Sequence, residues 1–314
     1  MAVTPIEQLG KDALRTKGWF GAYKWLILRR ISQAAIIGLF IAGPVGGIWI
    51  LKGNLAGSWL FETVPLVEPF VFLQMLAAGM FGFLTTTLIG VAIVVAFYAL
   101  IGGRAYCAWV CPVNVITDAA AWVRRKLGIT QSAKISPHTR WWMLGAALVL
   151  AAITGQLAYE LVNPVSIVHR GLIFGMGAAT WLVIAGIFLF DVFIAKHGWC
   201  SHVCPMGAMY SLIGAKAAVK VTSPNRAQCD DCMECFEVCP EPKILPPALK
   251  QGMKQGLPAM VTSHLCTRCG RCVDICSKDV FAFAFLTPGK AAPAESGKGS
   301  SMEEEEEREL EKAS

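Results

Sequence analysis

The sequence predicts a membrane all-α four-helix bundle followed by a small α+β domain that is rich in cysteine. The chain has 314 residues, of which 55% are hydrophobic and only 16% charged, a balance that soluble domains of this length rarely show. Four apolar stretches are long enough to cross a bilayer, which takes about 20 residues. Twelve cysteines follow tight, regular spacings, and in a long chain such spacings indicate metal binding rather than a disulfide scaffold.

The four predicted spans follow one another as Ile31–Leu51, Gly79–Ile101, Trp141–Val162 and Leu172–Ala195. The apolar segment Trp59–Ala78 carries Glu62, Glu68 and two prolines. We therefore expect a loop on the membrane surface or a short re-entrant piece there, rather than a fifth span. We expect no signal peptide, because the first 30 residues hold six basic residues and no short apolar run that ends in a cleavage site.

The basic residues of the loops predict the orientation of the spans. Lysine and arginine number six before the first span, one in the next loop, six in the middle loop and one between the third and fourth spans. Positively charged loops stay in the cytoplasm. We therefore expect a multi-pass protein of the bacterial inner membrane with both termini, the middle loop and the cysteine-rich domain in the cytoplasm. The basic residues behind the net charge of +6 lie in the segments that flank the apolar stretches, which indicates membrane topology and no nucleic-acid partner.

A short CxxxCP motif closes each pair of spans at its cytoplasmic end. Cys107 and Cys111 stand in the sequence CAWVCP, and Cys200 and Cys204 stand in its repeat CSHVCP. Residues four apart share a helix face, so each pair is a candidate for metal binding, for cycling as a dithiol, or for holding one further cofactor jointly with the other pair. The alternative is that the four are small buried residues with a purely structural role.

An amphipathic segment follows each CxxxCP motif. The apolar residues of the first segment lie near one helical face and are Val113, Ile116, Ala120, Val123 and Leu127. Those of the second segment are Met206, Met209, Leu212, Ile213 and Val219. Basic residues flank both segments, so we expect two helices that lie in the membrane interface.

Two further cysteine runs have the spacing of bacterial ferredoxins. The first run is Cys229, Cys232, Cys235 and Cys239, and the second is Cys266, Cys269, Cys272 and Cys276. In two-cluster ferredoxins the fourth cysteine of a run ligates the other cluster. The spacing therefore predicts two 4Fe-4S clusters, the first held by Cys229, Cys232, Cys235 and Cys276 and the second by Cys266, Cys269, Cys272 and Cys239. Zinc is the alternative, but zinc sites usually have two separated CxxC pairs.

These patterns divide the chain into a cytoplasmic segment 1–30, a membrane domain 31–221, a ferredoxin-type domain 222–287 and an acidic tail 288–314. We expect the tail to be disordered, and a short helix from Glu303 to Lys312 is the alternative. Ser277 follows the last cysteine, where such a run normally has proline. Arg268 and Arg271 flank the second cluster, and we expect both at the surface.

Together these features resemble the NapH family, the ferredoxin-type membrane subunits of quinol dehydrogenases that serve periplasmic nitrate reductase. The resemblance runs from about Arg30 to Thr287 and rests on the four spans, both CxxxCP motifs, the stretch CAWVCPVNVITDAAAWVRRKLGI and the tandem ferredoxin runs. The related NosR has a large N-terminal flavin-binding domain and CcoG ends in an extra β domain, and we expect neither here. MauN, from methylamine oxidation, is similar enough that the sequence does not reject it.

The resemblance implies an electron-transfer component of a quinol dehydrogenase rather than a stand-alone enzyme. Electrons would come from quinol in the membrane lipid and pass through a NapG-like periplasmic iron–sulfur protein and a c-type cytochrome to the reductase. A membrane redox sensor or a metallocentre-assembly protein that uses the CxxxCP thiols is the alternative function.

Because quinol oxidation releases protons, a carboxylate or a histidine is expected beside the quinone. The sequence does not select among the candidates and assigns no catalytic residue. The candidates are Asp118, Glu160, Asp191, His169, His197 and His202.

Overall fold

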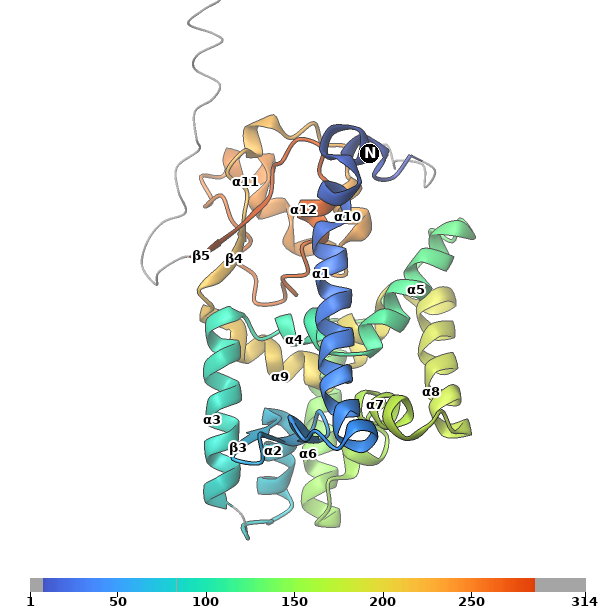
Figure 1. The fold of residues 1–314 in the computed structure, drawn as a ribbon. Helices are drawn as coiled ribbons and strands as arrows, with labels where there is room; N and C mark the ends of the chain where they lie inside the picture. The colour runs from blue at the N-terminus through green and yellow to red at the C-terminus, as the bar shows by residue number, and fades with distance from the viewer. Residues whose placement is uncertain (1–7, 83, 286–314) are drawn as a thin grey trace, which may run out of the picture.

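The structure, a computed structural model, describes residues 8–82 and 84–285. The predicted acidic tail 288–314, with the segment Glu303–Lys312, lies outside the described residues. The described chain is mostly helical, and Figure 1 shows its long helices at one end of the molecule and the cysteine-rich part at the other. Two small antiparallel sheets, one in each part, complete the fold.

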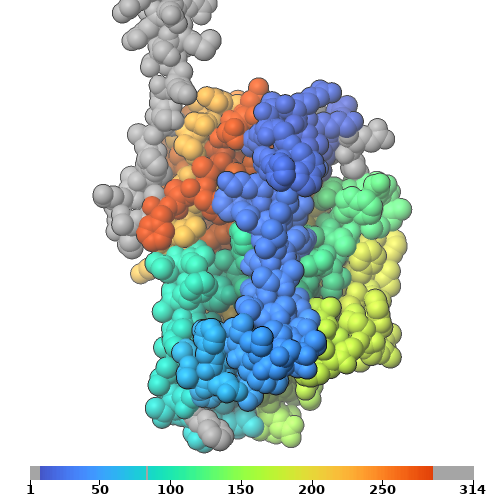
Figure 2. Space-filling view, in the orientation of Figure 1, coloured from blue at the N-terminus to red at the C-terminus, as the bar shows by residue number. Residues whose placement is uncertain are grey.

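The first helix, α1 (Lys11–Gly46), connects the two parts. It bends at Gly18, whose φ of 71° lies in the left-handed region, and then runs down one face of the molecule (Figure 2). It ends at Gly46 because Gly47 adopts a φ of 71° and donates its N–H to carbonyls of the last turn. Helix α1 therefore crosses the predicted boundary at residue 30. The predicted end of this span at Leu51 is wrong, since Leu51 begins strand β1.

The segment between the first two long helices forms a small sheet and a short helix. Its strands pair antiparallel in chain order, and they are β1 (Leu51–Gly53), β2 (Gly57–Leu60) and β3 (Val64–Val67). Helix α2 (Pro69–Ala77) starts after Glu68, whose carboxylate accepts a hydrogen bond from the N–H of Val71 at 2.7 Å. With nine residues, α2 is too short to cross a bilayer.

Helix α3 (Leu84–Ile101) and four later helices make up most of the remaining apolar part. The later ones are α5 (Val113–Lys126), α6 (Thr139–Thr154), α7 (Pro164–Phe174) and α8 (Ala178–Leu189), which continues as a π-helical turn at Phe190–Ile194. The third predicted span is too long, because Gly155, with a φ of 65°, ends α6. The start predicted for the fourth span is wrong, because Gly175, with a φ of 112°, separates α7 from α8.

Among the described helices, α1 and α3 are long and apolar enough to cross a membrane by length and composition. Only 22% and 17% of their most apolar segments is buried, so protein does not cover these apolar faces. Helices α6 and α8 also expose large apolar side chains, with Trp142 78% and Leu182 73% exposed. Apolar surface of this extent is typical of a protein that contacts lipid. The other apolar helices are shorter, and a four-span bundle stays a prediction.

The cysteine-rich part has its own small sheet and its own apolar core. Strand β4 (Val219–Thr222) pairs antiparallel with β5 (Ala282–Phe285), so the first and last described strands of this part meet. The short helices are α10 (Glu234–Val238), α11 (Lys250–Lys254) and α12 (Arg271–Ile275). They surround buried residues that include Val221, Leu245 and Val280. The predicted domain boundary at residue 222 falls inside β4. The sequence does not show that residues 219–222 pair with residues 282–285, about 60 positions later.

The second of the two predicted interfacial helices is shorter than expected. Helix α9 (Pro205–Ile213) ends at a close approach of two backbones, where a Cβ on Gly214 would lie 2.2 Å from the backbone nitrogen of Gly103. A Cβ on Gly103 would lie 1.6 Å from the carbonyl oxygen of Tyr210, so both positions need glycine. Val219, which the sequence places on this helix, belongs to β4 instead.

A buried ion triad joins the two parts of the molecule. Arg104 is fully buried and donates from Nη1 to the carboxylate of Glu241 at 2.9 Å, and Nη2 of Arg140 lies 3.0 Å from the same oxygen. Arg104 also donates to the carbonyl oxygens of Leu265, at 2.9 Å, and Cys200, at 3.0 Å. Both arginines come from the helical part and Glu241 comes from the cysteine-rich part. The triad therefore fixes how the two parts sit together.

Replacing Glu241 with glutamine is expected to lower the free energy of unfolding by about 3–5 kcal/mol, because two buried guanidinium charges lose their counter-ion. Denaturant unfolding of the detergent-solubilised protein measures the change. Glu62→Gln is the matched control, because the Lys52–Glu62 pair is 54% and 55% exposed and should contribute about 1 kcal/mol or less. Equal effects of the two substitutions would contradict the role of the triad.

Candidate metal centres

Two loops of the cysteine-rich part share one backbone conformation. In the loop before α10, Asp231 and Met233 adopt φ values of 57° and 63°. In the loop before α12, Arg268 and Gly270 adopt φ values of 51° and 75° at the equivalent positions. Turns of this kind point successive backbone N–H groups at one centre, an arrangement found at many iron–sulfur sites. The two loops are duplicate halves of one arrangement.

The eight cysteines of the two runs line two small cavities. The cavity that we call site one is lined by Cys229, Cys232, Cys235 and Cys276. The cavity that we call site two is lined by Cys239, Cys266, Cys269 and Cys272. In each cavity three cysteines come from one run and the fourth comes from the other. The structure thus brings together the two sets of four that the spacing predicts.

The donor set of each cavity fits an iron–sulfur cluster better than a single ion. Within residues 8–82 and 84–285, no three His, Cys, Asp or Glu side chains are grouped so that they could hold one metal ion. A 4Fe-4S cube takes one thiolate on each of its four irons, so its ligands surround a volume and not a point. Zinc, in contrast, gathers four ligands on one ion.

The two sites differ in charge and in exposure. Site one is acidic and open, because Cys232 is exposed and a carboxylate oxygen of Asp231 lies 3.7 Å from the sulfur of Cys229. Site two is basic and enclosed, because Cys269 is buried and Nη1 of Arg271 lies 3.6 Å from its sulfur. Burial alone would raise the pKa of the Cys269 thiol, but the neighbouring arginines outweigh it and lower the pKa. Their charge favours the thiolate form that a cluster requires.

The prediction that Arg268 and Arg271 lie at the surface is wrong. Arg268 is 5% exposed and donates to the carbonyl oxygen of Val219 at 2.7 Å. Arg271 forms an ion pair with Asp118 on α5. The indole N–H of Trp109 also donates to the carbonyl oxygen of Arg268 at 3.0 Å. These contacts hold site two against the helical part, and they join residues too far apart in the sequence for spacing to reveal them.

The four CxxxCP cysteines gather where the two parts meet. Cys107 lies in α4 (Ala105–Trp109), Cys111 follows this helix, and Cys200 and Cys204 precede α9. Burial raises the pKa of all four thiols. The charges of the other thiols in the set raise the pKa of Cys111, Cys200 and Cys204 further. Cys111 belongs to an apolar cluster against which Cys107 and Cys204 pack, so the two motifs lie near each other.

A group of buried polar side chains lies beside these thiols, and sequence reasoning missed it. Four of its atoms have no hydrogen-bond partner among the described residues, and they are Oε1 of Glu68, Nε2 of Gln74 and the hydroxyl oxygens of Tyr106 and Tyr159. Tyr106 and Tyr159 share an apolar cluster with Cys111. Helix α2 brings Gln74 inward, where its carbonyl oxygen accepts the backbone N–H of Tyr159 at 3.2 Å. The acidic residues within the apolar segment 59–78 were the available signal.

Four of the six ionisable candidates lie apart from one another. The carboxylate of Glu160 accepts side-chain hydrogen bonds of 2.7 Å from residues close to it in the sequence. The carboxylate of Asp191 accepts the backbone N–H of Trp199 at 3.0 Å. His169 is fully buried and packs edge-on against a phenylalanine ring at a centroid distance of 4.7 Å. His202 lies near the buried ion triad, whose charges act on its ring.

The structure brings the other two candidates, Asp118 and His197, to one cavity. Asp118 pairs with Arg30 at 2.5 Å, with Arg29 at 3.5 Å and with Arg271. Burial alone would raise the pKa of this carboxyl group, but Arg271 and the other cations outweigh it and lower the pKa to about 2. Asp118 is therefore a charged carboxylate whose charge the arginines balance.

Comparisons with known proteins point to iron–sulfur chemistry in both parts of the chain. A family described as "4Fe-4S binding domain" matches residues 83–130 and 178–223, which contain the two CxxxCP motifs. A second family with the same description matches residues 266–280, which contain the second ferredoxin run. No solved structure matches the chain significantly.

Relatives of this chain are similar over most of its length. The ferredoxin-type protein NapH of Escherichia coli K12 is 46% identical over 272 residues, which cover 87% of this chain and 93% of that protein. NapH of Haemophilus influenzae is 47% identical over 275 residues, with 88% and 94% covered. The methylamine utilization ferredoxin-type protein MauN of Methylorubrum extorquens is 44% identical over 250 residues, with 80% and 86% covered.

Proposed function

Because the chain belongs to the NapH family, and is thus an iron–sulfur electron-transfer protein, we propose that it takes electrons from membrane quinol and passes them toward a periplasmic reductase. The observation that supports this most strongly is the pair of four-cysteine cavities, sites one and two. We assign one 4Fe-4S cluster to each site. A bound cluster of this kind accepts and donates single electrons. We propose nitrate reductase as the final acceptor, in preference to a methylamine system.

Contacts with the helical part support site two as the site closer to the membrane. Trp109 and Arg104 donate hydrogen bonds to backbone carbonyls of the loop that contains Cys266 and Cys269. The residues of site two are also more enclosed, whereas Cys232 of site one is exposed. Site one is therefore the more open site and the one farther from the helical part. In the proposed system the partners are a NapG-like iron–sulfur protein and a c-type cytochrome.

The CxxxCP thiols are proposed to take part in the passage of electrons. We place both clusters on the cytoplasmic side and the acceptor in the periplasm, so electrons need a further carrier within the membrane part. The four thiols lie at the junction of the two parts, and the 4Fe-4S family that matches residues 83–130 and 178–223 includes both motifs. They are the candidates for this carrier, either as a dithiol pair or as ligands of a further cluster.

The topology that we propose has four spans, with both termini and the cysteine-rich part in the cytoplasm. A reporter that is active only in the cytoplasm should therefore be active when fused after Thr287. The same reporter fused at Leu66, in strand β3, should be silent, because the loop between the first two spans carries a single basic residue. An active fusion at Leu66 with a silent one at Thr287 would reverse the orientation and move the clusters to the periplasm.

A further inference from the structure

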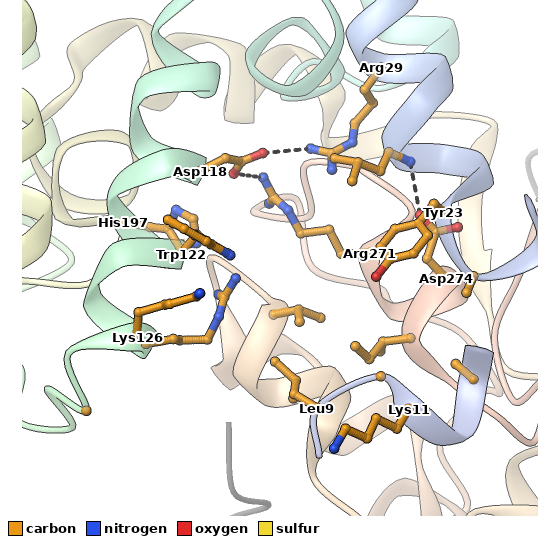
Figure 3. A pocket seen from close by; sticks show the side chains of 18 residues that line it. Leu9, Lys11, Tyr23, Arg29, Asp118, Trp122, Lys126, His197, Arg271 and Asp274 are labelled. Carbon is orange, nitrogen blue, oxygen red and sulfur yellow. Dashed lines mark hydrogen bonds and ion pairs between the residues drawn. The ribbon is translucent and has the colours of Figure 1, made fainter. Parts of the chain in front are cut away.

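A cavity of about 1120 Å³ lies between the N-terminal half of α1, helix α5 and helix α12. Its volume is on the scale of pockets that hold small organic molecules, about 300–1,000 Å³. Figure 3 shows Tyr23 and Trp122 on opposite sides of it, with Asp118, Arg29 and Arg271 converging at one end. We call this end the polar end of the cavity.

One part of the cavity wall is apolar, whereas Lys11, Arg125 and Lys126 line another part. The apolar part is formed by Ala22, Leu26 and Ile275 together with the rings of Tyr23 and Trp122. Two aromatic rings on opposite sides of an apolar space suit a flat ring between them. This part of the wall suits a planar ring.

The polar end offers hydrogen-bonding groups gathered around one carboxylate, that of Asp118. Asp118 is paired with the arginines around it, and Nε of the buried Arg29 has no partner among the described residues. His197 is 3% exposed and lies at the same cavity. Burial, assisted by the charge of Arg271, lowers the pKa of His197 to about 3, so its imidazole is uncharged and can accept a hydrogen bond. A ligand with hydroxyl or carbonyl oxygens finds both donors and acceptors here.

The polar end also lies next to site two. Arg271 is shared, because it pairs with Asp118 at the cavity while its Nη1 lies 3.6 Å from the sulfur of Cys269. One side chain therefore separates the cavity from a proposed cluster ligand. A molecule bound at this end would stand beside a redox centre.

The rim of the cavity carries exposed aromatic residues. Trp122, which lines the cavity, is 54% exposed, and Trp19, which is 59% exposed, packs on Tyr23 with the ring centroids 5.8 Å apart. Exposed aromatic rings of this kind are typical of the membrane–water interface. A lipid-soluble ligand would reach the cavity from the membrane at this rim.

From these observations we propose that the cavity binds the head group of the quinol, with Asp118, Arg29 and His197 around its oxygens and Tyr23 and Trp122 on either side of its ring. The inference rests on the proposed function, because it locates the donor site of that function. Oxidation of a quinol to a quinone releases two electrons and two protons. The two assigned clusters take one electron each, and water at the open rim takes the protons.

A photoreactive azidoquinone tests the location directly in the intact, cluster-loaded protein. Labelling followed by peptide mapping should find the label on the peptides that contain Tyr23 and Trp122, and an excess of plain quinone should abolish it. If phosphatidylglycerol vesicles abolish the labelling and plain quinone does not, the cavity binds an anionic lipid head group and the proposal is overturned. Lys11 and Lys126 at the cavity would suit such a head group. Label on α2 around Glu68 would place the quinol at the buried polar group instead.

A matched pair of variants separates the site from the fold. Ala22 is 7% exposed and lines the cavity next to Tyr23, so Ala22→Phe should place a ring in the proposed binding position and lower the labelling roughly tenfold. Ala35 is exposed on the same helix, so Ala35→Phe should leave labelling unchanged. Both variants should keep their iron and their reduction by dithionite. Unchanged labelling in Ala22→Phe would overturn the location. If quinol reduces the wild-type clusters but the azidoquinone labels another region, only the location is wrong. If quinol does not reduce the clusters and the azidoquinone does not label the protein, the proposed function fails.

Discussion

Replacing Cys107 and Cys204 together with serine is expected to bring electron transfer from quinol to the periplasmic iron–sulfur partner down to its background rate, while about eight irons per chain remain bound. The two residues come from different CxxxCP motifs that the structure brings together, so the double variant removes one thiol from each motif. The eight cysteines of sites one and two are complete without them. Transfer of electrons onward from the clusters and loading of the clusters should therefore separate in this variant.

The experiment needs two measurements and one control. Iron analysis reports cluster loading, and anaerobic reduction of the purified periplasmic iron–sulfur partner after addition of a quinol analogue reports electron transfer through the protein. Val115→Ala, on the exposed face of α5 just after the first motif, should behave as wild type. Normal quinol-dependent reduction of the partner by the double variant would show that the thiols are structural. Wild-type protein with about twelve irons, falling to about eight in the variant, would identify the thiols as ligands of a third cluster.

Replacing Cys276 with alanine is expected to remove the cluster of site one and to leave about four irons per chain. The reason is that Cys276 lines the cavity of Cys229, Cys232 and Cys235, although it belongs to the other run. Ser277→Ala is the control, since it changes the next residue and removes no thiol. Iron and acid-labile sulfide analysis of the purified anaerobic protein measures the loss.

Double variants reveal which site has been lost. Adding Cys229→Ala to Cys276→Ala should cost no further iron, because both residues belong to site one. Adding Cys266→Ala should remove the remaining iron, because Cys266 lines site two. The opposite pattern would show that each run holds its own cluster, and the crossed assignment would then be wrong.

The cysteine sets could be predicted from sequence because their geometry is local. Each CxxC step places its thiols within one tight loop, and the left-handed residues Met233 and Gly270 recur at the same step of the two loops. Only the partner of the fourth cysteine is long-range, and the known pattern of two-cluster ferredoxins supplied it. The resemblance to the NapH family, which rests on the same motifs, is confirmed by relatives 46% and 47% identical to the chain.

Helix ends and buried charges could not be predicted in the same way. Hydropathy averages over a window, so it does not detect the turns at Gly155 and Gly175 that interrupt apolar stretches. Arg104 and Arg140 look like loop charges in the sequence, yet both are buried against Glu241. Contacts of this kind join residues far apart in the chain, and a single sequence carries no signal for them.

Reduction of the purified protein by a quinol analogue under anaerobic conditions tests the central claim most directly. Our account predicts that protein with about eight irons and eight acid-labile sulfides per chain loses part of its iron–sulfur absorbance when the quinol is added, without any other reductant. Protein whose absorbance falls with dithionite but does not change with quinol would contradict the account, because its clusters would then be intact and its proposed electron donor wrong.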